Sequence, residues 1–84
     1  MYEYYFTFRS MTQAQRAAGL LQQGGIRATP RRTPRAVSRG GCGNAVAVGA
    51  ADVYRAAGML RGALVLFDKC YRVSPQGGAE EVFP

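Results

Sequence analysis

Alternating apolar and polar residues open the chain and predict a strand over residues 2–9, where aromatic side chains favour pleated structure. A helix is predicted next, because residues 10–13 have the S-x-x-Q form of a capping box and an apolar stripe with helical spacing follows. Gly24-Gly25 predicts the end of that helix. The apolar face of the strand is Tyr4, Phe6 and Phe8, and the stripe of the helix is Ala14, Ala17, Ala18 and Leu21.

The remaining pattern predicts two more strands, a second helix, a last strand and a tail. Pro30 and Pro34 interrupt regular structure and predict an irregular loop that runs to Gly41. The small residues after this loop alternate weakly, which is typical of a central strand covered by helices. The expected ranges are strand 26–29, strand 44–48, helix 50–62, strand 64–73 and a flexible, unpatterned tail over 74–84.

This order of elements predicts an α+β fold. With right-handed crossovers it is a ferredoxin-like βαββαβ sandwich, in which a four-stranded antiparallel sheet carries two helices on one face. Residues 1–73 are expected to form this single domain. Tyr5 and Leu66 are expected to point outward from the open face of the sheet, which suggests a homodimer through that face.

Composition narrows the possible chemistry. The 84 residues include eleven Lys and Arg against five Asp and Glu, two cysteines and no histidine, for a formal charge of +6. Histidine-based catalysis is therefore excluded, and neither a structural metal site nor paired-carboxylate catalysis has enough residues. No nucleotide-binding glycine loop is present, so no cofactor and no metal are expected. The N-terminus lacks the pattern of a signal peptide and no apolar run could span a membrane, which predicts a cytoplasmic protein without membrane contact.

Basic residues gather in one part of the chain. Five arginines fall within thirteen residues that contain no acid, and a glycine-framed cysteine follows directly. Guanidinium groups stabilise a thiolate, and flanking glycines leave the sulfur open and free backbone amides to face an anion. The pattern predicts a reactive thiol within an anion- or partner-binding surface. The run begins at Arg27, and the predicted site is Cys42 with Arg31, Arg32, Arg35, Arg39, Gly41 and Gly43.

Each of these residues also has a structural interpretation. Cys42 could be a small buried residue at the start of a strand, since free cysteines are commonly inert. Cys70 lies inside a predicted strand between Lys69 and Tyr71, and we expect it to contribute packing only. A bridge between the two cysteines is not expected, because two strand spacings are about 9–10 Å and a disulfide needs Cα atoms within about 7 Å.

The arginines alone support an alternative function. They could be solvated loop charge, or the Arg27–Arg39 loop could grip an acidic protein surface, a phosphate metabolite or RNA without any catalysis. RNA is the least favoured of these partners, because an RNA-recognition motif needs stacking aromatics on its third strand and residues 44–48 contain none.

The arginine-rich segment also resembles a known family. Thr33-Pro34-Arg35, then Ser38, then Cys42-Gly43 and the small apolar strand after it are similar to a family of small bacterial selenium/sulfur carrier-like proteins. The resemblance runs from about Tyr4 to Arg72. Family members commonly place serine beside the Cys-Gly pair, where this chain has Gly40-Gly41.

The resemblance implies a carrier of reduced sulfur or selenium rather than an enzyme. Cys42 matches the carrier cysteine, and it would bear a persulfide or selenosulfide whose negative charge Arg35 and Arg39 stabilise. Sulfur or selenium donor and acceptor proteins are the implied partners.

Overall fold

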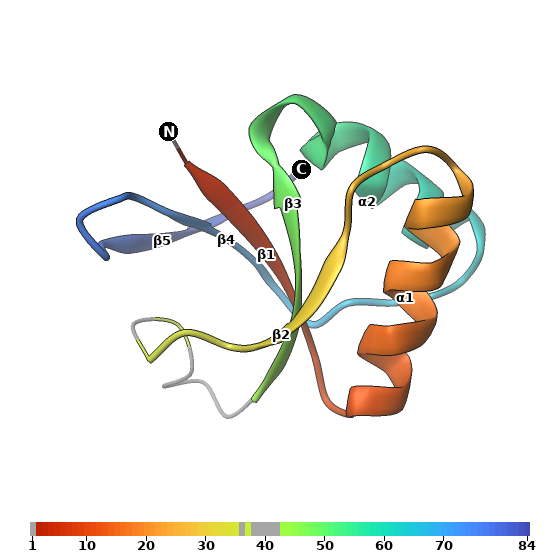
Figure 1. Cartoon of the computed structure of the whole chain (residues 1–84), viewed down its shortest axis with the longest axis horizontal. Helices are drawn as coiled ribbons and strands as arrows, with labels where there is room; N and C mark the ends of the chain where they lie inside the picture. The colour runs from red at the N-terminus through yellow and green to blue at the C-terminus, as the bar shows by residue number, and fades with distance from the viewer. Residues whose placement is uncertain (1, 36, 38–42) are drawn as a thin grey trace.

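An antiparallel sheet carries both helices on one of its faces (Figure 1). The computed structural model describes residues 2–35, 37 and 43–84, and within them the sheet has five strands in the order β2-β3-β1-β4-β5. The protein is therefore α+β, as predicted. The strands are β1 (Glu3–Phe8), β2 (Thr29–Arg32), β3 (Asn44–Gly49), β4 (Cys70–Val73) and β5 (Ala79–Val82); the helices are α1 (Met11–Gln23) and α2 (Val53–Gly62), the latter preceded by a 3-10 turn over Ala50–Asp52.

The first helix forms where its capping signals lie. The Ser10 hydroxyl accepts a hydrogen bond from the Gln13 N–H at 3.2 Å, so one of the free amides at the start of α1 has a partner. The chain leaves the helix through Gly24 and Gly25, and Gly25 has a φ of 84°, a conformation that a side chain would oppose. Both predicted boundaries of this helix are confirmed.

The main core lies between the helices and the face of the sheet that β1 presents through Phe6 and Phe8. Leu21 of α1, Leu60 of α2 and Val46 of β3 complete its centre, and all five side chains are at most 1% exposed. Each such burial contributes roughly 1.5–3 kcal/mol to the stability of the fold. The alternation of residues 2–9 thus predicted correctly which face of β1 is turned toward the core.

Strand β2 differs from its prediction, because it begins at Thr29 and includes Pro30. Proline was expected to exclude regular structure here. It is tolerated because β2 is an edge strand, in which a residue without an N–H need not break the ladder. Arg31 and Arg32 consequently lie on a strand rather than in an irregular loop.

The sheet has a fifth strand where the sequence predicted an unpatterned tail. β5 pairs with β4 in antiparallel register, with Cys70 opposite Val82 and Arg72 opposite Glu80. The turn between the two strands uses Gly77, whose φ is 91°, and Arg72 forms an ion pair with Glu80. The expectation of four strands is therefore corrected to five. The order of the first four strands is compatible with a ferredoxin-like arrangement.

The fourth strand is shorter than predicted, since it begins at Cys70 instead of Leu64. After α2 the Val65 N–H donates to the Leu60 carbonyl at 2.9 Å, and Leu64 takes a φ of 57° to close this turn. The connection then runs to β4 through Leu66, which is 69% exposed and does not lie on a strand.

The second face of the sheet carries a small cluster of Tyr5, Ala45 and Ala47, with Val73 packed against it. Tyr5 was expected to point outward as a contact for a second copy. It does lie on this face, but it is only 5% exposed, and its hydroxyl donates to the Glu3 carboxylate at 3.1 Å. Tyr5 is therefore a structural residue. No helix in the described part of the chain has the length and apolar character needed to cross a membrane.

Candidate functional site

The two ends of the segment that contains Cys42 meet at one end of the sheet. The Thr33 N–H donates to the Gly43 carbonyl at 3.0 Å. This bond follows directly on the pairing of Arg32 with Asn44, so it extends the β2–β3 ladder by one step. The sheet therefore fixes both the residue that precedes Pro34 and the residue that follows Cys42 in the chain.

The predicted site residues divide into two groups. Cys42, Arg39 and Gly41 lie outside the described residues, and so does Ser38 of the family-like segment. The remaining predicted residues are all exposed, and they belong to β2, to the turn after it and to the start of β3. They are Arg31, Arg32, Arg35 and Gly43.

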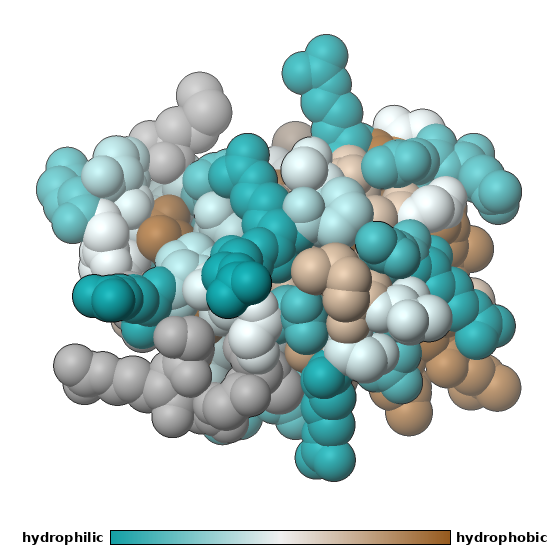
Figure 2. Space-filling model, turned by 60° about the horizontal axis from the view of Figure 1, so that its bottom comes forward, coloured by the Kyte–Doolittle hydropathy of each residue, from teal (hydrophilic) through white to brown (hydrophobic). Residues whose placement is uncertain are grey.

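The arginines do not form one cluster. Arg31 and Arg32 are consecutive on β2, so their side chains leave opposite faces of the strand. Arg31 lies on the second face of the sheet, where its guanidinium is 3.6 Å from the Glu3 carboxylate. Both of these side chains are about half exposed, so this ion pair is weak. Hydrophilic side chains cover much of this end of the molecule, which Figure 2 turns toward the viewer.

Gly43, the residue after Cys42 in the chain, has space around it among the described residues. A Cβ atom added to Gly43 would meet no other atom within 4 Å among the described residues. None of the described residues therefore crowds Gly43; whether the Cys42 sulfur is open stays a prediction.

Two further residues of the segment were not identified as important from the sequence. Val37 is 5% exposed, and its N–H donates to the Pro34 carbonyl at 2.9 Å, which is the hydrogen bond of a β-turn. Thr33 is 7% exposed, and its hydroxyl oxygen is buried without a hydrogen-bond partner among the described residues. The Thr-Pro-Arg motif marked this segment, but no sequence signal distinguishes a buried threonine from an exposed one.

Cys70 has the properties of a packing residue. Its side chain is 1% exposed and belongs to the main core. Burial raises the pKa of its thiol to about 12, and the nearby Arg61 guanidinium offsets only part of that rise. Cys70 is therefore protonated and shielded near neutral pH, which confirms the expectation of a structural role.

No metal chemistry is supported by the described part of the chain. Residues 2–35, 37 and 43–84 contain no group of three or more His, Cys, Asp or Glu side chains that could hold a metal ion.

The fold and site define a small α+β protein in which an arginine-bearing strand leads into a cysteine-containing segment closed by the sheet. The model of the family described as "Putative Se/S carrier protein-like" matches residues 3–72. The chain belongs to this family, and the resemblance read from the sequence is confirmed. No curated protein matches the chain, and no solved structure does.

Proposed function

We propose that this protein carries reduced sulfur or selenium as a persulfide or selenosulfide on Cys42. Membership of the Se/S carrier-like family supports the cargo. The observation that carries the choice of residue is the hydrogen bond between Thr33 and Gly43, because it anchors the residue next to Cys42 just before β3 begins.

The transfer needs no cofactor and no external redox partner. The Cys42 thiolate attacks the terminal sulfur of a donor persulfide; the new S–S bond forms as the donor S–S bond breaks, and the donor leaves as a thiolate. The transferred sulfur keeps its proton or loses it to water. An acceptor thiolate then attacks the same sulfur and releases Cys42 as a thiolate, so charge and electrons balance in both steps. Selenium follows the same scheme.

The surroundings of the segment support an anionic cargo. Arg31 and Arg32 precede the anchored Thr33, and Arg35 follows it. A persulfide is a stronger acid than a thiol, and positive charge within a Debye length of about 8–10 Å stabilises its anion. The buried, protonated Cys70 does not compete for the cargo.

The partners and compartment follow from this chemistry. A protein with a persulfide or selenosulfide donates, and a protein with a free thiolate accepts. Because the carrier thiol must stay reduced between transfers, we place the protein in the cytoplasm. A homodimer through the second face of the sheet remains a prediction, and its contacts would be residues other than the buried Tyr5.

The alternative is a binding module for an anion or an acidic partner, formed by the arginines between Arg27 and Arg39. The exposure of Arg31, Arg32 and Arg35 favours it as much as it favours the carrier. Substitution separates the two functions. A carrier loses sulfur transfer in Cys42→Ser, whereas a binding module keeps its affinity in Cys42→Ser and loses it in the triple variant R31Q/R32Q/R35Q.

The pH dependence of the rate of Cys42 alkylation is a second test of the carrier function, because it reports the pKa of the thiol. An apparent thiol pKa below the free-thiol value of about 8.5, read from the midpoint of this curve, agrees with an activated thiolate. The triple variant R31Q/R32Q/R35Q should raise that apparent pKa. A midpoint at or above about 8.5 in the unsubstituted protein would contradict an activated thiolate. The variant Cys70→Ala removes the second thiol from the measurement, and Arg16→Gln on α1 is the control for a change in net charge.

A further inference from the structure

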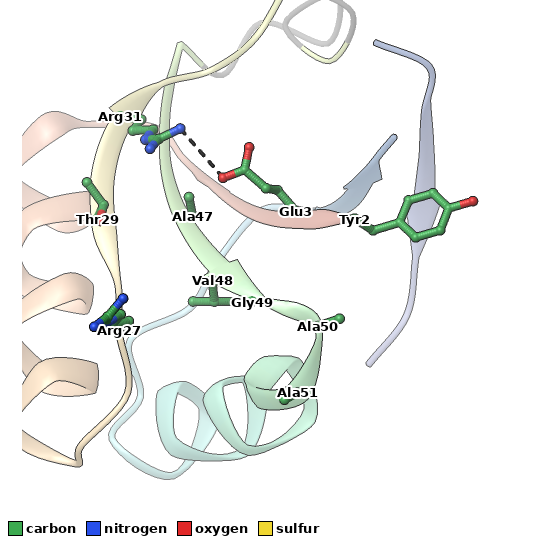
Figure 3. A pocket seen from close by; sticks show the side chains of 10 residues that line it. All are labelled: Tyr2, Glu3, Arg27, Thr29, Arg31, Ala47, Val48, Gly49, Ala50 and Ala51. Carbon is green, nitrogen blue, oxygen red and sulfur yellow. Dashed lines mark ion pairs between the residues drawn. The ribbon is translucent and has the colours of Figure 1, made fainter. Parts of the chain in front are cut away.

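A groove lies on the second face of the sheet, between β2 and the end of β3 (Figure 3). Its volume of about 740 Å³ is within the range of pockets that hold small molecules. One wall is β2 with Arg27, which lies two residues before the strand. The other lining residues are Tyr2 and Glu3, with the mostly small residues from Ala47 to Ala51. Small side chains at these positions are what keep the groove open.

The polar groups of the groove come mainly from one wall. Arg27, Thr29 and Arg31 alternate along the chain, so all three side chains lie on the same face of this wall (Figure 3). Arg31 faces the Glu3 carboxylate at 3.6 Å, whereas Arg27 has no ion pair or hydrogen bond with any described residue. The groove therefore combines one uncompensated guanidinium, one hydroxyl donor and one guanidinium that is already paired.

Glu3 limits the positive charge of the groove. Its carboxylate accepts a hydrogen bond from the Tyr5 hydroxyl at 3.1 Å and also faces Arg31, so it is held on the β2 side of β1. An anion entering the groove meets Arg27 freely, but it must compete with Glu3 for Arg31. Removing the charge of Glu3 should therefore make a second guanidinium available.

We propose that this groove binds a small organic anion, a carboxylate or a phosphate ester that carries an apolar portion. Arg27 binds the anionic group, with a hydrogen bond from the Thr29 hydroxyl, because a planar guanidinium pairs with two oxygens of either group. The apolar portion lies over the small residues of β3 and the turn that follows it. Arg31 adds more to binding once the competing negative charge of Glu3 is removed.

The Arg27 end of this groove is separate from the Cys42 segment, whereas Arg31 stands opposite Ala45, close to that segment. Asn44, which follows Gly43, begins β3 at one end of the sheet, and Gly49 ends it beside Glu3 at the other. Five residue steps at roughly 3.4 Å place these ends about 17 Å apart. Binding in the groove therefore does not depend on the proposed carrier function, and Cys42→Ser should leave it unchanged.

Titration of the full chain with phenyl phosphate and with benzoate, followed by amide NMR, tests the proposal. We expect saturable shifts at Arg27, Thr29 and Gly49 with at least one of the two probes, and much weaker shifts with inorganic phosphate or phenol alone. The probe that saturates the site at lower concentration identifies the anionic group. The absence of saturable shifts with both probes at millimolar concentrations, or shifts centred outside the groove, would overturn the proposal.

Three variants distinguish a built site from general basic charge. Arg27→Gln should weaken binding at least about tenfold, because it removes a charge-assisted hydrogen bond. Glu3→Gln should tighten binding several-fold, a gain that misfolding cannot produce. Arg16→Gln, which removes the same charge from α1, should have no effect. Equal losses in Arg27→Gln and Arg16→Gln would contradict the site, and unchanged affinity in Glu3→Gln would contradict the role of Arg31.

Discussion

The Thr33 amide and the Gly43 carbonyl are hydrogen-bonded at 3.0 Å, and nine residues of sequence lie between them. Closing a loop of this length costs the chain conformational entropy. The hydrogen bonds between β2 and β3 offset that cost, so the sheet anchors both ends of the segment. Cys42 directly precedes Gly43 in the chain. Thr33 therefore anchors one end of the segment that contains Cys42.

The Thr33 hydroxyl should contribute no stability through hydrogen bonding. It is buried without a partner among the described residues, so Thr33→Val should leave the free energy of unfolding unchanged or raise it by about 1 kcal/mol. Thr7→Val is the matched control, because the Thr7 hydroxyl accepts from the Lys69 N–H at 3.1 Å and donates to the Lys69 carbonyl at 3.2 Å. That variant should lose about 1–2 kcal/mol.

Denaturant unfolding of both variants measures the difference. A loss of more than 1 kcal/mol in Thr33→Val would show that its hydroxyl has a partner after all.

Stability should fall in alkaline solution because of Cys70. Burial raises the pKa of its thiol from 9.0 to about 12, so between these values the folded chain holds a proton that the unfolded chain has lost. The free energy of unfolding therefore decreases as pH rises from about 9 toward 12. Burial and the Glu3 carboxylate also raise the pKa of Tyr5 above 10.0, which adds to the same trend.

Unfolding curves at several pH values test this linkage. Cys70→Ala should unfold with a shallower alkaline slope than the unsubstituted chain, and Tyr5→Phe should be shallower only above about pH 10. Identical slopes in all three proteins would show that neither group stays protonated in the folded state.

Leu64 should be a site of local strain. It ends α2 with a φ of 57°, which is unfavourable for a residue with a Cβ by about 1 kcal/mol or more, and its side chain is 82% exposed. Leu64→Gly should therefore be about 1 kcal/mol more stable than Leu64→Ala. Both variants lose the exposed leucine side chain, so the difference between their melting curves measures the cost of the positive φ for a residue with a Cβ. Equal stabilities of the two variants would contradict backbone strain at this position.

Strand β5 should shield Cys70. Val82 stands opposite Cys70 in the ladder and packs against the core. Val82→Ser should weaken the attachment of β5 by about 1–2 kcal/mol and so raise the rate of Cys70 alkylation in the native state about 5- to 30-fold. Phe83→Ser is the control, because Phe83 is 84% exposed and should not affect this rate. An unchanged rate in Val82→Ser would show that β5 does not protect the thiol.

The fold was predictable where patterns are local. The Ser10 cap, the glycine stop of α1 and the alternation of β1 depend on neighbouring residues, and all are present in the structure. β5 was not predictable, because Glu80 and Glu81 are poor strand formers without alternation. Their pairing comes from the Gly77 turn and the ion pair to Arg72, which are interactions with the preceding strand.

The candidate site was predictable in part. The spacing of the arginines and the glycine-framed Cys42 predicted a site in this segment, and the family match over residues 3–72 covers it. The sequence did not show that Arg31 and Arg32 lie on opposite faces of a strand, because Pro30 suggested a loop. Only the sheet topology shows that this proline lies in an edge strand, where it is tolerated. The Thr33–Gly43 bond joins residues ten apart, and a sequence pattern does not reveal such contacts.

Sulfur loading on Cys42 tests the central claim most directly. The protein is incubated with a cysteine desulfurase and cysteine, and the peptide that contains Cys42 is analysed by mass spectrometry without reductant. We predict the mass of one added sulfur atom on Cys42 in the unsubstituted protein and in Cys70→Ala, and none in Cys42→Ser. Absence of the added sulfur on Cys42, or its presence on Cys70 instead, would contradict the carrier function.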